Sequence, residues 1–287
     1  MQLRGILLLT FRELWAKKIT VGLFIISTLI WVMLAFALNL DIVDGSLAGL
    51  RIFGQDTRAT ETITDPESGE VLRQGLTLEQ LVMGAEEFVA RLTYWAGILL
   101  ALFATASLLP NLLERGRVDL LLSKPMSRTR LLAGHVLGVM MAMSVLAVYL
   151  FGMVWLVMSL KTGIWHPRFL LSIVIVVAMF AVMYSVVTLI SVTARSAPLA
   201  LIVAYGIIFS SGILAFKDEL APQINPPWRQ VFLAFYHVLP NFGEVTGTIA
   251  QLSSTDPVAS WYPFLSSLLF GAVLYAGTAF FFTRRDF

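Results

Sequence analysis

The chain has 287 residues, of which 58% are hydrophobic and 13% are charged, and its formal net charge is +2. Soluble domains average roughly a quarter charged residues, so this composition argues against an ordinary soluble protein. There is no cysteine, which excludes disulfide bonds and thiolate sites.

Six segments contain no Asp, Glu, Lys or Arg, and each is at least 21 residues long. A helix needs roughly 20 apolar residues to cross the hydrocarbon core, and backbone groups in lipid must be satisfied within the segment. We therefore predict an all-α polytopic membrane protein that forms one domain over residues 1–287; a soluble all-helical core is the alternative. The predicted transmembrane helices are 19–40, 92–113, 131–160, 169–194, 196–216 and 257–283.

Residues 1–18 precede the first predicted span and do not resemble a cleaved signal peptide, because they contain Glu13 and lack a small-residue cleavage site. Their apolar residues recur at spacings of three and four, with basic residues between them. This pattern predicts an amphipathic helix on the membrane surface, and a frayed basic terminus is the alternative. The apolar positions are Leu3, Ile6, Leu7, Phe11, Leu14 and Trp15.

Residues 41–91 form the largest polar region, which we expect to be extracytoplasmic. The segments 61–64 and 71–74 flank a Pro/Gly-containing stretch, 65–69, and predict a β-hairpin. Thr77 and Gln80 have the spacing of a capping box, and an apolar stripe from Leu78 to Leu92 predicts a helix that runs into the second span. The region is interpreted either as a lid or partner platform, or as a solvated loop with local structure.

Residues 114–130 connect the second and third predicted spans and carry five of the 20 basic residues. Leu120–Leu122 can form one short apolar helical turn, which Pro125 ends, and Ser127 can cap the following helix. Arg128 and Arg130 then lie in the first turn of that helix, where the dipole disfavours cations. Either lipid phosphate or acidic groups of a cytoplasmic partner are expected to compensate them.

Residues 217–256 are expected to be the second extracytoplasmic region. The uncharged stretch 231–240 is too short to cross a membrane, and it predicts a re-entrant or interfacial helix before the last span. Trp228, Tyr236, Trp261 and Tyr262 are suited to the level of the lipid headgroups.

The distribution of charge predicts the orientation. Six spans put both termini on one side, together with 114–130 and Arg195, and this side has 12 basic and 4 acidic residues. The other side has 8 basic and 14 acidic residues. The basic side is therefore predicted to be cytoplasmic, and its charges are explained by insertion and anionic lipid without nucleic acid.

Several kinds of active site are missing from the sequence. No lysine follows a glycine, which excludes a P-loop, and neither Gly-x-Ser-x-Gly nor His-Glu-x-x-His occurs. We therefore predict that the chain is not an enzyme. The predicted spans contain no acidic or basic residue apart from His135, which we expect at headgroup level rather than in a proton relay. Seven methionines cluster in the predicted third and fourth spans, and they are interpreted either as packing residues or as ligands of a soft metal ion. They are Met140, Met141, Met143, Met153, Met158, Met179 and Met183.

The pattern Glu114-x-Gly116-x-x-Asp119-x-x-Leu122-Ser123-x-Pro125-x-Ser127-Arg128, followed by Gly134, resembles the cytoplasmic loop of ABC transporter permeases of the type-2 (ABC-2) class. The order of predicted elements is also similar to that family over the whole chain, as are residues 239–241 and 284–287. Two positions depart from the family pattern: Arg117 replaces a small hydroxyl residue, and His135 replaces a lysine.

The resemblance implies that 114–130 contains a coupling helix that docks into a separate ABC ATPase subunit. It implies that this partner binds ATP and Mg, that the chain itself needs no cofactor or metal, and that two permease subunits, identical or different, form the transporter. The implied ATPase-docking residues are Glu114, Gly116, Asp119, Leu120, Leu122, Ser123, Pro125, Ser127 and Arg128.

The function expected from this resemblance is that of the membrane subunit of an ATP-driven exporter in the bacterial inner membrane, with both termini cytoplasmic. The uncharged spans favour a lipidic, apolar or weakly polar cargo. The alternative is a non-transporting scaffold or force-transmitting subunit whose working surface is 41–91.

Overall fold

The structure is a computed structural model that describes residues 5, 12–14, 18–43, 46–52, 55–57, 60–64, 71–75, 77–113, 127–254 and 256–284. Within these ranges six helical stretches are long and apolar enough to cross a membrane. The prediction of an all-α polytopic membrane protein is confirmed. These stretches are Lys18–Phe36, Leu78–Leu112, Thr129–Thr162, Pro167–Ala194, Ala197–Leu214 and Tyr262–Arg284.

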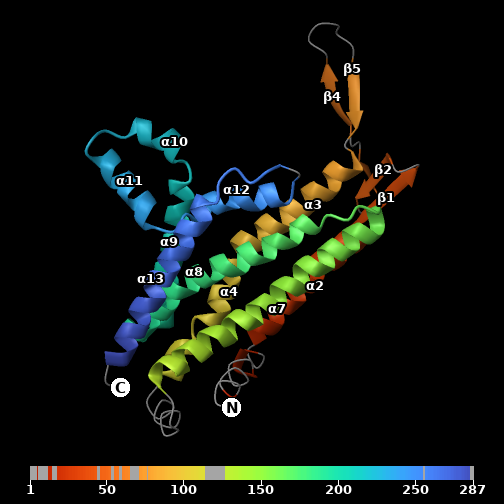
Figure 1. Cartoon of the computed structure of the whole chain (residues 1–287). Helices are drawn as coiled ribbons and strands as arrows, with labels where there is room; N and C mark the ends of the chain where they lie inside the picture. Colours follow the sequence, from red (N-terminus) through yellow and green to blue (C-terminus); the bar gives the residue numbers. More distant parts are fainter. Residues whose placement is uncertain are drawn as a thin grey trace.

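The first, third, fourth, fifth and sixth stretches are each built on one long helix: α2 (Lys18–Ala37), α7 (Arg128–Thr162), α8 (Leu171–Ala194), α9 (Ala197–Leu214) and α13 (Tyr262–Arg284). A 3₁₀ turn, η2 (Pro167–Leu170), leads into α8. The start of α2 and the end of α13 lie at the same end of the bundle (Figure 1), which we call the terminal end.

The second stretch is a composite of α3 (Leu78–Leu92), a π-helical turn η1 (Thr93–Gly97), α4 (Ile98–Thr105) and α5 (Leu108–Leu112). A turn at 106–107 separates α4 from α5. Pro110 has no N–H to donate to the carbonyl four residues before it, and that carbonyl belongs to this turn. The predicted capping box is confirmed, because Gln80 N–H donates to Thr77 and Thr77 N–H donates to the Gln80 side chain.

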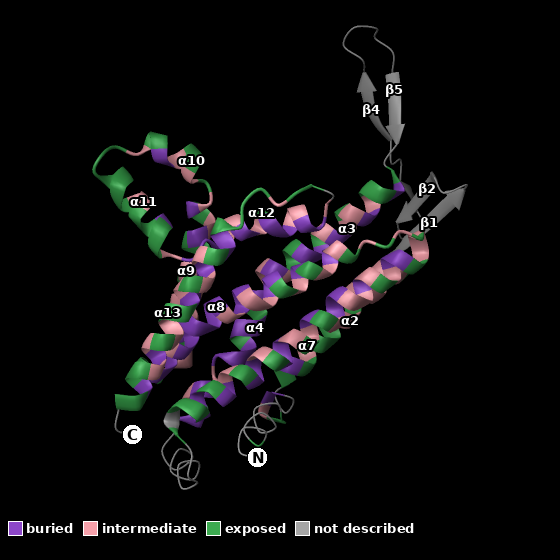
Figure 2. Cartoon of the chain, in the orientation of Figure 1, coloured by how far each residue is buried: buried purple, intermediate pink, exposed green. Residues whose placement is uncertain are grey.

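Helix α8 is the centre of the bundle and packs against α7, α9, α13 and α4. In its most apolar window 61% of the residues are buried, compared with 11% for α2 at the periphery. Figure 2 shows that buried residues are frequent along α8. An apolar helix that packs on several sides belongs to the interior, whereas α2 presents most of its apolar surface outwards.

Two small antiparallel sheets lie at the end opposite the terminal end (Figure 1). One consists of β1 (Leu38–Val43), β2 (Ser46–Ile52) and β3 (Gln55–Thr57), and the other of β4 (Thr60–Thr64) and β5 (Val71–Gly75). The predicted hairpin is confirmed, with Glu61 paired to Gln74 and Thr64 to Val71. The first sheet was not predicted, and α2 accordingly ends at Ala37 rather than at residue 40.

Four short elements connect α9 to α13 at this same end: α10 (Lys217–Leu220), η3 (Ala221–Gln223), α11 (Trp228–Val238) and α12 (Phe242–Leu252). A short helical segment before the last span was expected within 231–240. The segment that is buried in the bundle is α12, however, which packs on α9, α3, α13 and α8. Most of α11 is exposed, with only Tyr236 buried.

The N-terminal amphipathic helix falls largely outside the described residues. Gly5 and 12–14 are helical, and Leu14 is only 1% exposed and belongs to the main hydrophobic core. The expected level of His135 in the membrane stays a prediction, but the packing of α7 against α8 buries its side chain within the protein. Its Nε2 lies 3.3 Å from the hydroxyl of Tyr184 on α8.

Candidate functional site

The helix ends on either side of residues 114–126 meet in a small hydrophobic cluster at the terminal end. Each of its seven members is at most 6% exposed, and they come from the α5 end, the α7 start, the α8 end and the α13 end. Both flanks of the predicted coupling loop are therefore fastened to one another and to two further helices. We call the following set the terminal-end cluster: Leu109, Leu112, Leu113, Leu131, Leu132, Val192 and Phe282.

The start of α7 has the predicted cap. Ser127 has an extended backbone, and its hydroxyl accepts a hydrogen bond from the Arg130 N–H at 3.4 Å. The first turn of α7 contains no acidic residue, and Arg130 is exposed. The positive end of the helix dipole and the basic first turn together favour an anionic group outside this helix.

Seven of the nine predicted docking residues lie outside the described residues: Glu114, Gly116, Asp119, Leu120, Leu122, Ser123 and Pro125. Ser127 and the backbone of Arg128 are described, and both belong to the start of α7. The structure therefore defines where the loop leaves and re-enters the bundle, and docking by these residues stays a prediction.

A polar group holds together α10, α11 and α12 at the opposite end. The Lys217 ammonium donates to Glu244 at 2.8 Å and to the Tyr236 hydroxyl at 2.5 Å, and Tyr236 donates to the other Glu244 oxygen at 2.8 Å. Burial by itself lowers the pKa of Lys217, but its hydrogen bonds to Glu244 and Tyr236 outweigh burial and raise the pKa above its ordinary value. The three side chains thus tie exposed α11 to buried α12.

The beginning of α12 is fixed by contacts from three other elements. Gly243 approaches α9 so closely that a Cβ atom would lie 2.7 Å from the Ser211 carbonyl oxygen, and its N–H donates to the Ser211 hydroxyl. The Tyr94 hydroxyl donates to the Phe242 carbonyl at 2.7 Å, and the two rings stack at 4.3 Å. Asn241 N–H donates to Ser267 of α13. This end of the bundle is therefore rigidly cross-connected.

A family model for the ABC-2 family of transporter proteins matches residues 6–287. The chain belongs to the ABC-2 transporter family. The resemblance seen in the loop pattern is thereby confirmed over nearly the whole length, and the protein is a membrane component of an ABC transporter system. No curated protein matches the chain.

A hydrogen-bonded Glu–His pair in this ABC-2 protein was not predicted from the sequence. Glu86 on α3 is completely buried, and one of its oxygens lies 2.7 Å from Nδ1 of His166, which precedes η2. The signal was present in the sequence, because Glu86 falls on the same helical face as Leu78, Val82 and Val89, all of which are buried. Phe88, in the apolar stripe of the same helix, is 62% exposed.

The methionines of this ABC-2 protein are distributed as packing residues. Met143, Met158, Met179 and Met183 are buried within the main hydrophobic core, whereas Met141 is 58% exposed. Thioether side chains adapt well to such irregular apolar surroundings. Among the described residues no group of His, Asp or Glu is arranged to hold a metal ion.

Proposed function

We propose that the chain is the permease subunit of an ATP-driven ABC exporter in the bacterial inner membrane. A separate ATPase that binds ATP and Mg docks at 114–130, and a second permease subunit, identical or different, completes the transporter. The observation that carries the proposal is the terminal-end cluster, because it connects both flanks of this loop with the ends of α8 and α13.

The need for a separate ATPase follows from what the sequence contains. No lysine follows a glycine anywhere in the chain, so a P-loop is excluded. The segments 92–113, 131–160, 169–194, 196–216 and 257–283 contain no acidic residue, lysine or arginine. Carriers that use ion gradients keep such groups within the membrane, so coupling to an external ATPase is the simpler source of energy.

The packing supports a mechanical route from the loop into the bundle. A push on 114–126 acts on Leu113 and on the start of α7, and these are packed against Val192 of α8 and Phe282 of α13. Close-packed interiors transmit displacement rather than absorb it. Because α8 packs against most other spans, movement of its end changes their relative positions.

The distribution of charge supports the proposed orientation. The predicted cytoplasmic side has 12 basic and 4 acidic residues in the sequence, and the predicted outer side has 8 basic and 14 acidic residues. An excess of Lys and Arg favours the cytoplasmic side. The chain has no cysteine, so single-cysteine variants can test this without background labelling.

The docking proposal is tested by co-purifying the chain with candidate ATPases and measuring ATP hydrolysis. Substitution of Leu122→Asp or Asp119→Lys is expected to abolish co-purification and the stimulation of hydrolysis. Ala259→Asp, at an exposed residue of the opposite end, is the matched control and is expected to change neither. Unchanged assembly and stimulation in both loop variants would refute docking at 114–130.

A second candidate function is force transmission to a partner on the outer side without transport. The observation that favours it is the pair of sheets between α2 and α3, which give this region ordered backbone pairing. Replacement of Thr60–Gly75 by a short linker separates the two functions. If the chain is an exporter, this variant is expected to retain ATP-dependent transport in vesicles. If it is a force-transmitting subunit, the variant is expected to retain ATP hydrolysis but to lose the cellular effect that depends on the outer partner.

A further inference from the structure

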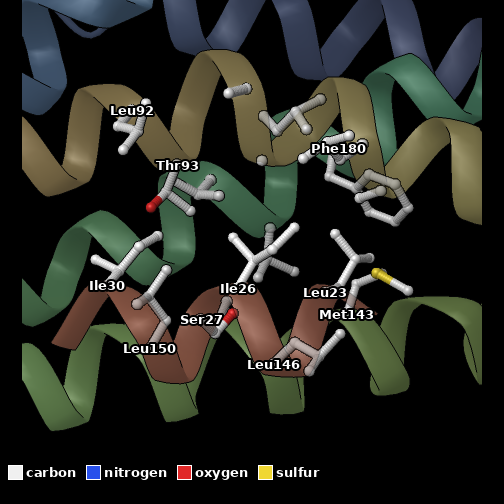
Figure 3. Close-up of a pocket in the computed structure, with 18 residues that line it drawn as sticks. Leu23, Ile26, Ser27, Ile30, Leu92, Thr93, Met143, Leu146, Leu150 and Phe180 are labelled. Atoms are coloured by element: carbon white, nitrogen blue, oxygen red, sulfur yellow. The ribbon is translucent and has the colours of Figure 1, made fainter. Parts of the chain in front are cut away.

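A cavity of about 180 Å³ lies between α2, η1 with α4, α7 and α8 (Figure 3). Its walls are almost entirely apolar, and they include Leu23, Ile30, Met143, Leu150 and Phe180. The lining residues Met143–Leu150 are at the middle of α7, which is 35 residues long. If α7 spans the bilayer, the cavity is at the depth of the hydrocarbon core.

The cavity is elongated and opens sideways. Along η1 and α4 it is lined from Leu92 to Ala101, nine residue steps or about 13 Å of helix. Ile26 of α2 and Leu100 of α4 both line it and are 44% and 41% exposed, so the mouth lies between these two peripheral helices. A narrow slot with a lateral mouth at this depth admits a chain from the bilayer more readily than a solute from water.

Helix α2 is held to the bundle along one line of contacts, which leaves the other side as the mouth. The Trp31 indole donates to the hydroxyl of Tyr149 on α7, and the Thr28 hydroxyl lies 3.0 Å from the same atom. The Phe24 ring stacks on Tyr149 at 4.8 Å. These contacts keep α2 on α7, and α2 also touches α4, so the mouth is a gap beside that contact.

The wall also contains one unusual backbone element with an unsatisfied hydroxyl. Thr93, Ala96 and Gly97 of the π-helical turn line the cavity, and π-helical turns are frequent at functional sites. The Thr93 hydroxyl oxygen is buried and has no hydrogen-bond partner among the described residues. This oxygen is out of reach of a molecule in the cavity, so the cavity offers apolar surface at this position too.

We propose that this cavity binds one acyl chain of a bilayer phospholipid. An unfilled slot of this kind would forfeit dispersion contacts on every wall, and the acyl chain is the apolar molecule that a membrane supplies through a lateral mouth. The length and the apolar lining of the slot suit a hydrocarbon chain. The site is independent of the proposed ATPase docking.

The experiment uses the full chain in nanodiscs of phosphatidylcholine that contain a fraction of phosphatidylcholine with a diazirine in its acyl chain. After photolysis, labelled residues are mapped by mass spectrometry. Cavity-facing residues within 92–101 and 143–150 are expected to be labelled more than Leu137 and Leu160, which are exposed at 51% and 69%. Equal labelling of all exposed and cavity-facing residues would overturn the proposal, and this arm needs no variant.

Variants then test the cavity itself. Ala147→Phe fills the slot and is expected to abolish the excess labelling, whereas Val145→Phe, at a residue of the same helix that is 53% exposed and outside the lining, is the matched control. In native mass spectrometry, Ala147→Phe is also expected to lose the phospholipid adduct that the unsubstituted chain retains. Retention of the adduct in folded Ala147→Phe, or an adduct with free fatty acid alone, would contradict a phospholipid site.

Discussion

Gly243 permits the closest helix contact described here, and its substitution gives a sharp test of how α12 is seated. In Gly243→Ala the new methyl group would lie 2.7 Å from the Ser211 carbonyl oxygen and 2.8 Å from the Ala215 Cβ atom. Ordinary contacts begin at about 3.4 Å, so α12 must move from α9 by several tenths of an ångström. That movement also stretches the 3.1 Å hydrogen bond from Gly243 N–H to Ser211.

Overpacking of this kind costs about 1–3 kcal/mol in the free energy of unfolding. Gly247→Ala, on the same helix, is the matched control, because no heavy atom lies within 4 Å of its added Cβ atom. An alanine in a helix interior is favoured over glycine by about 0.5–1 kcal/mol. The two variants should therefore change stability in opposite directions.

The assay is thermal unfolding of the purified protein in detergent, with both variants and the unsubstituted chain measured together. We expect a lower midpoint for Gly243→Ala and an equal or higher midpoint for Gly247→Ala. If Gly243→Ala is as stable as Gly247→Ala, α12 is not seated against α9 at this glycine, and the rigid coupling inferred for this end is wrong.

Three further predictions concern single interactions. Glu86→Ala removes the hydrogen-bond partner of the partly exposed His166 and is expected to lower the free energy of unfolding by about 1–3 kcal/mol, whereas Glu86→Gln, which keeps a hydrogen bond, should lower it less in the same melts. The pKa of Lys217 is raised in the folded protein, so its contact with Glu244 should contribute fully to folding stability below the ordinary pKa of 10.5. This contribution should be lost as the pH rises above that value. A Lys217→Met variant that loses as much stability at alkaline pH as the unsubstituted protein would contradict this. Leu131→Ala truncates a side chain of the terminal-end cluster that is 1% exposed, so it should lower the free energy of unfolding by about 2–5 kcal/mol. It should also reduce the stimulation of the ATPase. Full stimulation by a folded variant would count against mechanical coupling through this cluster.

The sequence predicted the number and approximate positions of the spans because uncharged runs of sufficient length have few other uses. It also predicted local features that depend on a few neighbouring residues, such as the Thr77 capping box and the Ser127 cap. The β4–β5 hairpin was predictable for the same reason, since its strands flank a short Pro/Gly segment.

Features that depend on packing were not predicted. The burial of His135 against Tyr184 and the pairing of Glu86 with His166 join residues that are 49 and 80 positions apart. The first sheet had a local signal that was overlooked, because Val43 pairs with Ser46 across Asp44-Gly45, a dipeptide favoured in two-residue hairpins. The role of Gly243 could not be predicted either, because nothing in the neighbouring residues indicates which helix will approach.

The central claim is that an ATPase engages residues 114–130 from the cytosol. It is tested most directly by placing a photo-crosslinking amino acid at Leu122 in living cells, with the same group at Ala259 as the control for the opposite end. The account predicts that the Leu122 adduct contains a P-loop ATPase and that the Ala259 adduct does not. An ATPase adduct from Ala259 alone, or Leu122 adducts only with proteins of the extracytoplasmic side, would contradict it.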